Sequence, residues 1–140
     1  MTLSGGDFFY FVSDPSWDDP PHPKIVVLVT QSREVVYVGC TKDANHVIER
    51  CKLIEGPRQQ YRTMIKITPV NCPTSHTNTY LNCNDLYSEA EKKIISSAKF
   101  SNKGSIPPPL FGAIKVAILN SPNTPGAIRT ILASPIKPSV

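Results

Sequence analysis

The chain has 140 residues, of which 40% are hydrophobic, and its formal net charge is +4 with a sequence pI of about 8.9. This length and composition are typical of one globular domain with a real core and exclude an intrinsically disordered chain. The mild positive charge permits a nucleic-acid partner, although a dedicated duplex-binding surface would carry denser lysine and arginine. No stretch approaches the ~18 apolar residues of a membrane span, and no secretory signal is visible. We therefore expect an intracellular protein, in the cytoplasm or nucleus, without membrane contact.

The elements expected in the first half are three strands and one helix. Aromatic and β-branched residues favour strands at 8–13, 24–30 and 34–40, and the short polar link between the last two favours a hairpin. After them, Thr41 or Asp43 can cap a helix over residues 44–54, with Val47, Ile48, Cys51 and Ile54 on one face. The proline-rich and acidic stretch 14–23 is expected to be a loop.

The second half predicts further strands at 62–70, 79–83 and 112–119 and a second helix over 86–100, capped by Asp85. The final residues are expected to be either a last strand at 127–132 or a partly ordered tail. The expected fold is α+β, with a small, mostly antiparallel sheet and two main helices. We expect residues 1–105 to form the core, and residues 106–140 to be a Pro-rich segment with one further strand and a tail.

Cysteine and proline also limit the interpretation. The four cysteines lie at positions 40, 51, 72 and 83 without a Cys-x-x-Cys pair, so the spacing favours reduced thiols over structural zinc. The 14 prolines are clustered, and each cluster indicates a boundary between elements. No Ser/His/Asp or Cys/His pattern and no Gly-rich phosphate loop stands out. His22, which lies between prolines, is expected to be a solvated loop residue.

A group of polar side chains could cut a phosphodiester bond. That reaction needs a group that activates the nucleophile, a cation for the developing charge and, in many enzymes, a carboxylate that holds a metal ion. Each candidate also has a structural explanation, because a strand tyrosine commonly packs in a core and acids near a helix start favour the helix dipole. The candidates are Tyr10, Tyr37, Lys42, His46, Arg50, Glu89 and Glu91.

These residues resemble the GIY-YIG nuclease family. Tyr37-Val38-Gly39 is similar to the family's second motif, and residues 91–95 (EKKII) are similar to its metal-binding helix, with Asn102 near the family's asparagine. The segment 10–15 (YFVSDP) resembles the start of this domain in the animal ankyrin-and-LEM-domain endonucleases. The resemblance implies a GIY-YIG-like fold, catalytic Tyr10, Tyr37, Lys42 and Arg50, and Glu91 as the ligand of Mg²⁺ if the domain is active.

The family's helical arginine would fall near residues 45–47, which are Asn-His-Val, so Lys42 or Arg50 would have to replace it. The sequence therefore favours a divergent, catalytically impaired domain that binds nucleic acid or a protein partner. Lys42, Arg50, Asn102 and Lys103 are the expected nucleic-acid contacts. The alternatives are an active metal-dependent DNA endonuclease and an unrelated intracellular or viral interaction module. In the last of these, the IPPPL segment and the Ser-Pro sites would serve polyproline recognition or kinase control.

Overall fold

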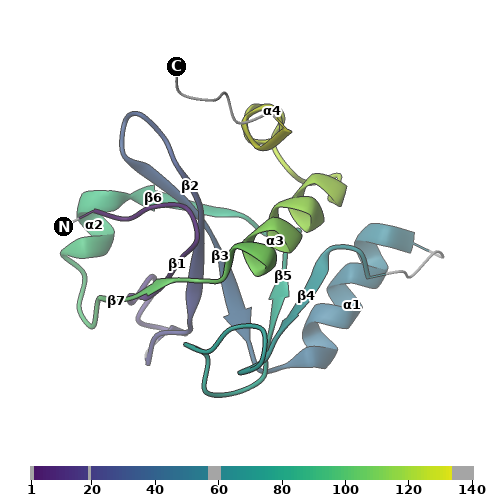
Figure 1. The fold of residues 1–140 in the computed structure, drawn as a ribbon, viewed down its shortest axis with the longest axis horizontal. Coiled ribbons are helices and arrows are strands. Elements are labelled where there is room, and N and C mark those ends of the chain that lie inside the picture. Colours follow the sequence, from purple (N-terminus) through teal and green to yellow (C-terminus); the bar gives the residue numbers. More distant parts are fainter. Residues whose placement is uncertain (1, 19, 57–60, 134–140) are drawn as a thin grey trace.

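A computed structural model describes residues 2–18, 20–56 and 61–133. Within these residues the strands form a seven-stranded sheet in the order β4-β5-β3-β2-β1-β7, and β6 pairs with β3 beside that path (Figure 1). Every strand pairing is antiparallel. The strands are β1 (Asp7–Tyr10), β2 (Lys24–Val29), β3 (Glu34–Thr41), β4 (Met64–Ile67), β5 (Thr79–Asn82), β6 (Tyr87–Ala90) and β7 (Ser101–Ser105). The expected α+β fold with a mostly antiparallel sheet is confirmed.

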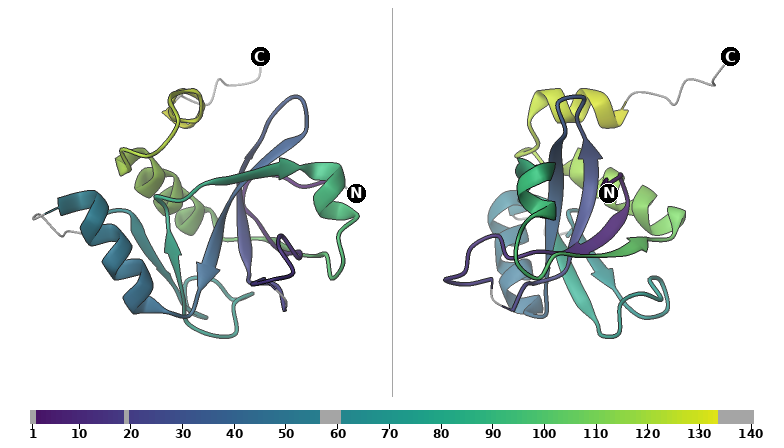
Figure 2. Two further views of the ribbon diagram at one scale, coloured as in Figure 1. Left: turned by 180° about the vertical axis from the view of Figure 1, so that it is seen from behind. Right: turned by 90° about the vertical axis from the view of Figure 1, so that its left-hand side faces the viewer.

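The helices lie around this sheet (Figures 1 and 2). Helix α1 (Ala44–Glu55) lies beside β4 and β5, and the short α2 (Glu91–Ile95) follows β6 directly. Helix α3 (Pro108–Asn120) covers one face of the sheet, and α4 (Gly126–Ala133) packs beside it. No helix in the described residues is both long and apolar enough to cross a membrane.

The strands and the helix expected between residues 8 and 55 are present, because their local signals are strong, although β1 ends at Tyr10 and not at Ser13. The β2–β3 hairpin has the predicted strands, with Val26 opposite Tyr37. Helix α1 begins where predicted, since the Asp43 side chain accepts a hydrogen bond from the His46 backbone N–H. Val47 and Cys51 of the predicted stripe are buried. The helix ends at Gly56, and the following residues 57–60 of the expected turn lie outside the described part of the chain.

Three expectations for the second half are wrong. The helix predicted over 86–100 is strand β6, the five-residue α2 and the turn that leads to β7, because residues 87–90 pair with β3. The strand predicted at 112–119 belongs to helix α3, which Pro108 begins at a position that needs no backbone donor. The last strand or tail expected at 127–132 is helix α4, whose Ile128 and Leu132 pack against the core.

The alternation of side chains along the central strands builds two separate cores. Phe8 and Tyr10 point to one face, which α3 covers with Leu110, Ile114 and Ile118. Phe9 and Tyr37 point to the opposite face, where they meet Leu3, Phe11 and Ile94. Because neighbouring side chains of a strand alternate between faces, this arrangement puts Tyr10 and Tyr37 on opposite sides of the sheet.

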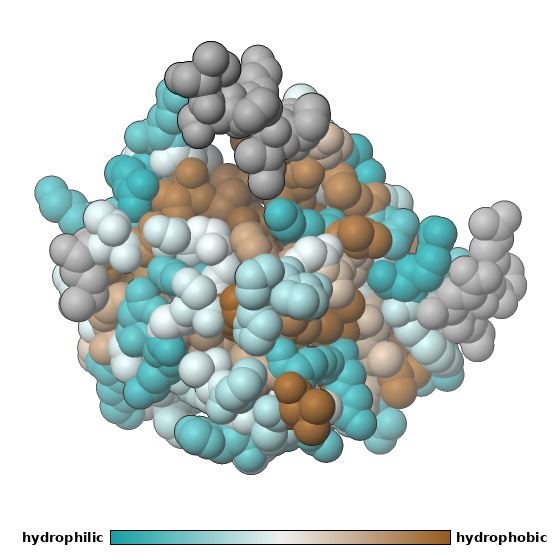
Figure 3. All heavy atoms as spheres, in the orientation of Figure 1, coloured by the Kyte–Doolittle hydropathy of each residue, from teal (hydrophilic) through white to brown (hydrophobic). Residues whose placement is uncertain are grey.

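Strand β3 changes its partner halfway along its length. Residues 34–37 pair with β6, whereas Cys40 and Thr41 pair with β5. The turn between β5 and β6 therefore crosses the open end of the β2–β3 hairpin. Together with the loop before β2 and the first turn of α1, it surrounds a pocket. The space-filling view shows polar residues mixed with apolar ones over the lower part of the molecule, and apolar residues grouped higher, in the region of α3 and α4 (Figure 3).

Candidate functional site

Two pockets meet at the 20–24 segment. The first, which we call the aromatic pocket, has a volume of about 420 Å³ and lies between the 13–22 loop, β3, α1 and β6. Its rings are Trp17, His22, Tyr37, His46 and Tyr87, and its carboxylates are Asp14, Asp85 and Glu89. The volume is in the usual range for small-ligand sites.

The second pocket, which we call the histidine pocket, has a volume of about 530 Å³ and lies beside the first. His22, Cys40 and Thr41 line both pockets. Here the charged and titratable groups are His22, Lys42, His76 and Asp43, together with the phenol of Tyr10 and the hydroxyls of Thr41, Ser75, Thr77 and Thr79. Asp43 already caps α1, so the histidine pocket combines hydroxyl donors with cationic or titratable nitrogen groups.

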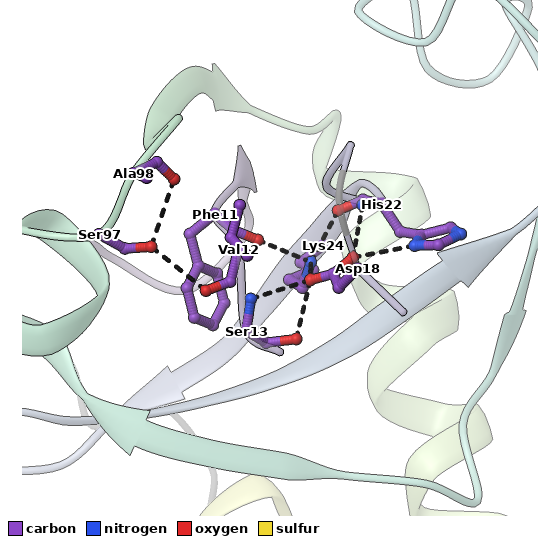
Figure 4. Close-up of polar contacts among 8 residues, drawn as sticks. All are labelled: Phe11, Val12, Ser13, Asp18, His22, Lys24, Ser97 and Ala98. Atoms are coloured by element: carbon purple, nitrogen blue, oxygen red, sulfur yellow. Dashed lines mark hydrogen bonds and ion pairs between the residues drawn. The ribbon is translucent and has the colours of Figure 1, made fainter. Parts of the chain in front are cut away.

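A buried carboxylate lies behind His22 (Figure 4). Asp18 is fully buried, and its Oδ1 accepts hydrogen bonds from the backbone N–H of His22 at 2.7 Å. Its Oδ2 accepts from the backbone N–H and the hydroxyl of Ser13, at 3.0 and 2.8 Å, and from the Lys24 ammonium at 2.7 Å. Burial raises the pKa of Asp18, but the hydrogen bonds from His22, Lys24 and Ser13 outweigh it and hold this pKa well below its usual range.

Lys24 completes this cluster from the first position of β2. Its side chain is only 3% exposed, and its ammonium also donates to the carbonyl oxygens of Phe11 and His22, at 3.1 and 2.9 Å. Burial lowers the pKa of Lys24, and the contact with Asp18 raises it part of the way back. Because both charges are buried and paired, Asp18 and Lys24 fix the loop that carries His22 and offer no free charge to a ligand.

The contact with Asp18 also determines which tautomer the neutral His22 ring adopts. The Nδ1 atom of His22 lies 2.9 Å from Asp18 Oδ1. An ionised carboxylate only accepts hydrogen bonds, so Nδ1 carries the proton and Nε2 of the neutral ring is left with a free lone pair. The His22 side chain is 46% exposed. The result is an oriented, accessible imidazole nitrogen in a wall shared by both pockets.

The predicted catalytic tyrosines lie in different surroundings. Tyr37 is 6% exposed and stacks on Tyr87, with ring centroids 5.7 Å apart. Burial, followed by the charge of Glu89, raises the pKa of Tyr37 well above its usual range, so the phenol keeps its proton and no phenolate is available as a base. Tyr10, on the opposite face, lines the histidine pocket together with Lys42. The structure thus brings Tyr10 and Lys42 together and separates both from Tyr37.

The remaining predicted nucleic-acid contacts are also spread out. Arg50 donates to Asp85 Oδ1 at 3.2 Å, at the edge of the aromatic pocket. Asn102 and Lys103 lie on β7, and Asn102 donates to Asp7 at 3.2 Å. Lys103 is exposed, and neither pocket includes Asn102 or Lys103.

Glu91 does not fit the magnesium site that the resemblance implies. Its carboxylate accepts hydrogen bonds from the Leu3 backbone N–H at 2.8 Å, from Arg33 Nε at 3.1 Å and from Arg33 Nη2. These bonds, that from Arg33 foremost, hold the pKa of Glu91 below its ordinary value. The carboxylate therefore already has a bidentate cationic partner. Within residues 2–18, 20–56 and 61–133, no group of three or more His, Cys, Asp or Glu side chains could hold a metal ion.

The four cysteines are free thiols in the structure, and all are buried. Burial raises the pKa of Cys83 to about 12 and that of Cys40 further still. Thiols in this state are not nucleophiles, because the thiolate is the reactive form.

The sequence interpretation missed the Asp18–His22–Lys24 cluster. One signal was present: Lys24 begins a strongly apolar run, and a lysine at the start of a buried strand needs a carboxylate nearby. The preceding loop supplies several acids, and Asp18 is the one whose position lets it reach Lys24 and His22 together.

No family model and no curated protein matches the chain. Among solved structures, the chain is similar to a protein described as "Endoribonuclease from Mycobacterial species", with a TM-score of 0.51 and 14% sequence identity. The similarity covers 96% of this chain and 97% of that one. The chain therefore shares its overall fold with an endoribonuclease over almost the full length of both.

Proposed function

We propose that this protein is a metal-independent endoribonuclease and that His22 is its general base. The observation that carries the proposal is the oriented His22 imidazole, whose Nδ1 is held by the buried Asp18, so that Nε2 of the neutral ring is the proton acceptor. The shared fold with an endoribonuclease is consistent with it. RNA is the favoured substrate because its own 2′-hydroxyl can act as the nucleophile, so no metal-bound water is needed.

The reaction uses groups of the histidine pocket. His22 Nε2 removes the proton from the 2′-hydroxyl, whose oxygen attacks the neighbouring phosphorus while the bond from phosphorus to the 5′-oxygen breaks. His76, which lines the same pocket, gives a proton to the leaving 5′-oxygen. The products are a 2′,3′-cyclic phosphate and a 5′-hydroxyl. Asp18 keeps the His22 ring in the reactive tautomer and stabilises the imidazolium that forms, as in other Asp–His pairs.

Lys42 supplies the cation in this proposal. Its side chain is exposed and lines the histidine pocket. The buried Lys24, by contrast, is already paired with Asp18. A lysine ammonium near the phosphate oxygens stabilises the charge that accumulates in the transition state. Tyr10, on the same wall, is a hydroxyl donor to the phosphate. Tyr10 and Lys42 are thus catalytic candidates from the sequence that also have a role here, although the mechanism differs from that of the GIY-YIG family.

The GIY-YIG assignment and a Mg²⁺-dependent DNA endonuclease stay predictions from the sequence. The position of Glu91 gives them no support, because Arg33 occupies its carboxylate. An impaired domain that binds nucleic acid without cutting it uses the same pockets and differs only in activity. For a partner that binds the Pro-rich segment, the surroundings are unfavourable: Ile106 and Leu110 are buried, and Pro108 begins α3.

The surroundings of the Ser-Pro and Thr-Pro sites are likewise unfavourable for a binding partner. Ser121 is fully buried and donates to Asn84 Oδ1 at 2.7 Å, and Thr124 is 7% exposed. The third site, Ser134-Pro135, lies outside the described residues.

The test is cleavage of a mixed-sequence, fluorophore-labelled RNA in EDTA and in Mg²⁺, beside DNA of the same sequence. We expect RNA cleavage in both buffers and none of DNA. His22→Gln should lower the rate about 100-fold or more, and Lys42→Ala should lower it by about 10-fold or more. Lys52→Ala is the matched control, because Lys52 pairs with Glu49 on α1 and lines neither pocket.

Cleavage that requires Mg²⁺ and is lost in Glu91→Gln but not in His22→Gln would overturn the proposal in favour of the metal-dependent nuclease. RNA binding without cleavage by any preparation that is folded by circular dichroism would overturn it in favour of the impaired domain.

A further inference from the structure

The aromatic pocket contains two large aromatic rings that are costly to expose. Trp17 is 58% exposed and Tyr87 is 46% exposed. Tyr87 stacks on the buried Tyr37 at an interplanar angle of 24°, and Trp17 lies 6.3 Å from the His22 ring, centroid to centroid. Exposed aromatic rings in a concave site are the usual platforms on which nucleobases stack.

The polar groups of this pocket include three carboxylates, which only accept hydrogen bonds when they are ionised. Asp85, Glu89 and Asp14 contribute carboxylates, and Asn82 contributes an amide that is engaged with Asp85 at 3.1 Å. Carboxylates accept hydrogen bonds from the amino groups of cytosine, adenine and guanine, whereas uracil presents carbonyl oxygens at the corresponding edge. Acceptors in the wall therefore favour a base that carries an exocyclic amino group.

Three carboxylates could also attract a lysine or arginine side chain of a protein. Two of these three charges, however, are already paired with cations. Arg50 donates to Asp85 at 3.2 Å, and Lys93 lies 3.3 Å from Glu89. Asp14 accepts from the backbone N–H and hydroxyl of Ser16 at 2.9 and 2.7 Å. The side chains of Asp85 and Glu89 are 34% and 31% exposed, against 10% for Glu91, so their oxygens can accept a further hydrogen bond. Acceptors with little net charge suit a neutral base better than a cation.

We propose that the aromatic pocket binds one nucleobase bearing an exocyclic amino group, stacked on Tyr87 and Trp17 and read by Asp85 and Glu89. Because His22 lines both pockets, this base belongs to a nucleotide beside the phosphate in the histidine pocket. The pocket would thereby select the bond that is cut. That role in selection rests on the proposed ribonuclease function; the binding of the base does not.

Trp17 is the single tryptophan of the chain and lines the pocket, so its fluorescence reports occupancy directly. The probes are CMP, AMP, GMP and UMP. We expect CMP, AMP and GMP to bind about 10-fold more tightly than UMP, the effect of one well-placed acceptor. Tyr87→Leu keeps an apolar side chain over Tyr37 but removes the stacking face, so it should weaken all four roughly 5- to 100-fold.

Asp85→Asn should reduce the preference for amino-bearing bases with little change in UMP affinity. Glu49→Gln is its control, because Glu49 is an exposed acid of α1 that pairs with Lys52 outside the pocket. Equal affinity for all four nucleotides, affinities that Tyr87→Leu leaves unchanged, or saturable binding of argininamide in place of nucleotides would each overturn the proposal.

Cleavage mapping on random-sequence RNA separates this inference from the proposed function. Ordered nucleotide binding in a protein that cuts no RNA would refute the ribonuclease and leave the base site standing. Cleavage in EDTA without any base preference, unaffected by Tyr87→Leu, would refute the base site and leave the ribonuclease standing.

Discussion

Two ionic clusters on the same side of the sheet contain similar groups but have different roles. In one, the fully buried Asp18 binds Lys24 and His22; in the other, Glu91 binds Arg33 and the backbone of Leu3. Both carboxylates accept several hydrogen bonds, and both have lowered pKa values. The difference is what each leaves free. Asp18 leaves an exposed imidazole nitrogen, whereas Glu91 and Arg33 satisfy each other and fasten the N-terminal segment to α2.

A carboxylate that matches a sequence motif is therefore not by itself evidence of a functional site. Glu91 matches a metal-binding motif in sequence, yet its oxygens are occupied. Asp18 matches no motif, yet it determines the orientation and tautomer of a reactive group. Four predictions test this contrast, in decreasing order of expected effect.

The largest expected effect is on stability. Asp18→Asn removes a buried charge and leaves the Lys24 ammonium buried without its counter-ion, so we expect a loss of about 3–5 kcal/mol in the free energy of unfolding. Glu91→Gln leaves the half-exposed Arg33 able to reach water, and should cost about 1–2 kcal/mol. Urea unfolding followed by circular dichroism measures both. Equal losses would mean that the two clusters do not differ as described.

The second effect is on catalysis. Single-turnover cleavage of RNA should fall about 100-fold or more in His22→Gln, while Glu91→Gln should stay near the wild-type rate if it is folded. The two variants are assayed at a temperature well below the unfolding midpoint of each. A Glu91→Gln rate as low as that of His22→Gln would show that the Arg33–Glu91 cluster takes part in the reaction.

The third effect is on the acid dependence of stability. The folded-state pKa of Asp18 lies below its unfolded value of about 3.9, so its contribution is present above that value and is lost as pH falls below about 4. Wild-type protein should therefore lose more stability between about pH 6 and pH 3 than Asp18→Asn does. Glu91→Gln should keep most of this pH dependence. Parallel wild-type and Asp18→Asn curves would contradict the strong hydrogen bonding of Asp18.

The smallest effect concerns the predicted contacts far from both pockets. Lys103→Ala should change RNA affinity by less than about twofold, because Lys103 lines neither pocket and therefore makes no phosphate contact in this account. Lys42→Ala should weaken binding more and lower the salt dependence by about one released counterion. Filter binding across a range of salt concentrations measures both slopes. A larger effect of Lys103→Ala would mean that the RNA-binding surface extends to β7.

The first half of the chain could be predicted because its signals are local. The apolar run of β2, the polar turn before β3 and the Asp43 cap each specify one outcome. The failures in the second half have a common cause. Residues 86–100 carry the charge order of a helix, but pairing of residues 87–90 with β3 overrides that local preference. The run 112–119 fits both a strand and a helix, and packing of Ile114 and Ile118 on the sheet decides for the helix.

The site was predictable only in part for a similar reason. Tyr10 and Lys42 were identified and share a pocket, but Tyr37 was grouped with them although strand alternation puts Tyr10 and Tyr37 on opposite faces. His22 is the exposed loop residue that the sequence predicts, but its contact with Asp18 could not be predicted, because Asp18 lies in an irregular loop. No periodicity describes such a loop, and the hydrogen bonds to Ser13 and Lys24 fix it only in the folded chain.

The central claim is that His22 cuts RNA through the 2′-hydroxyl without a metal ion. The most direct test is one RNA oligonucleotide, digested in EDTA and analysed by mass spectrometry, beside the same oligonucleotide with a single 2′-deoxy substitution at the mapped cleavage site. We expect a 2′,3′-cyclic phosphate and a 5′-hydroxyl from the first, and no cut at that position in the second. Equal cutting of both oligonucleotides, or products that carry a 5′-phosphate, would contradict the account.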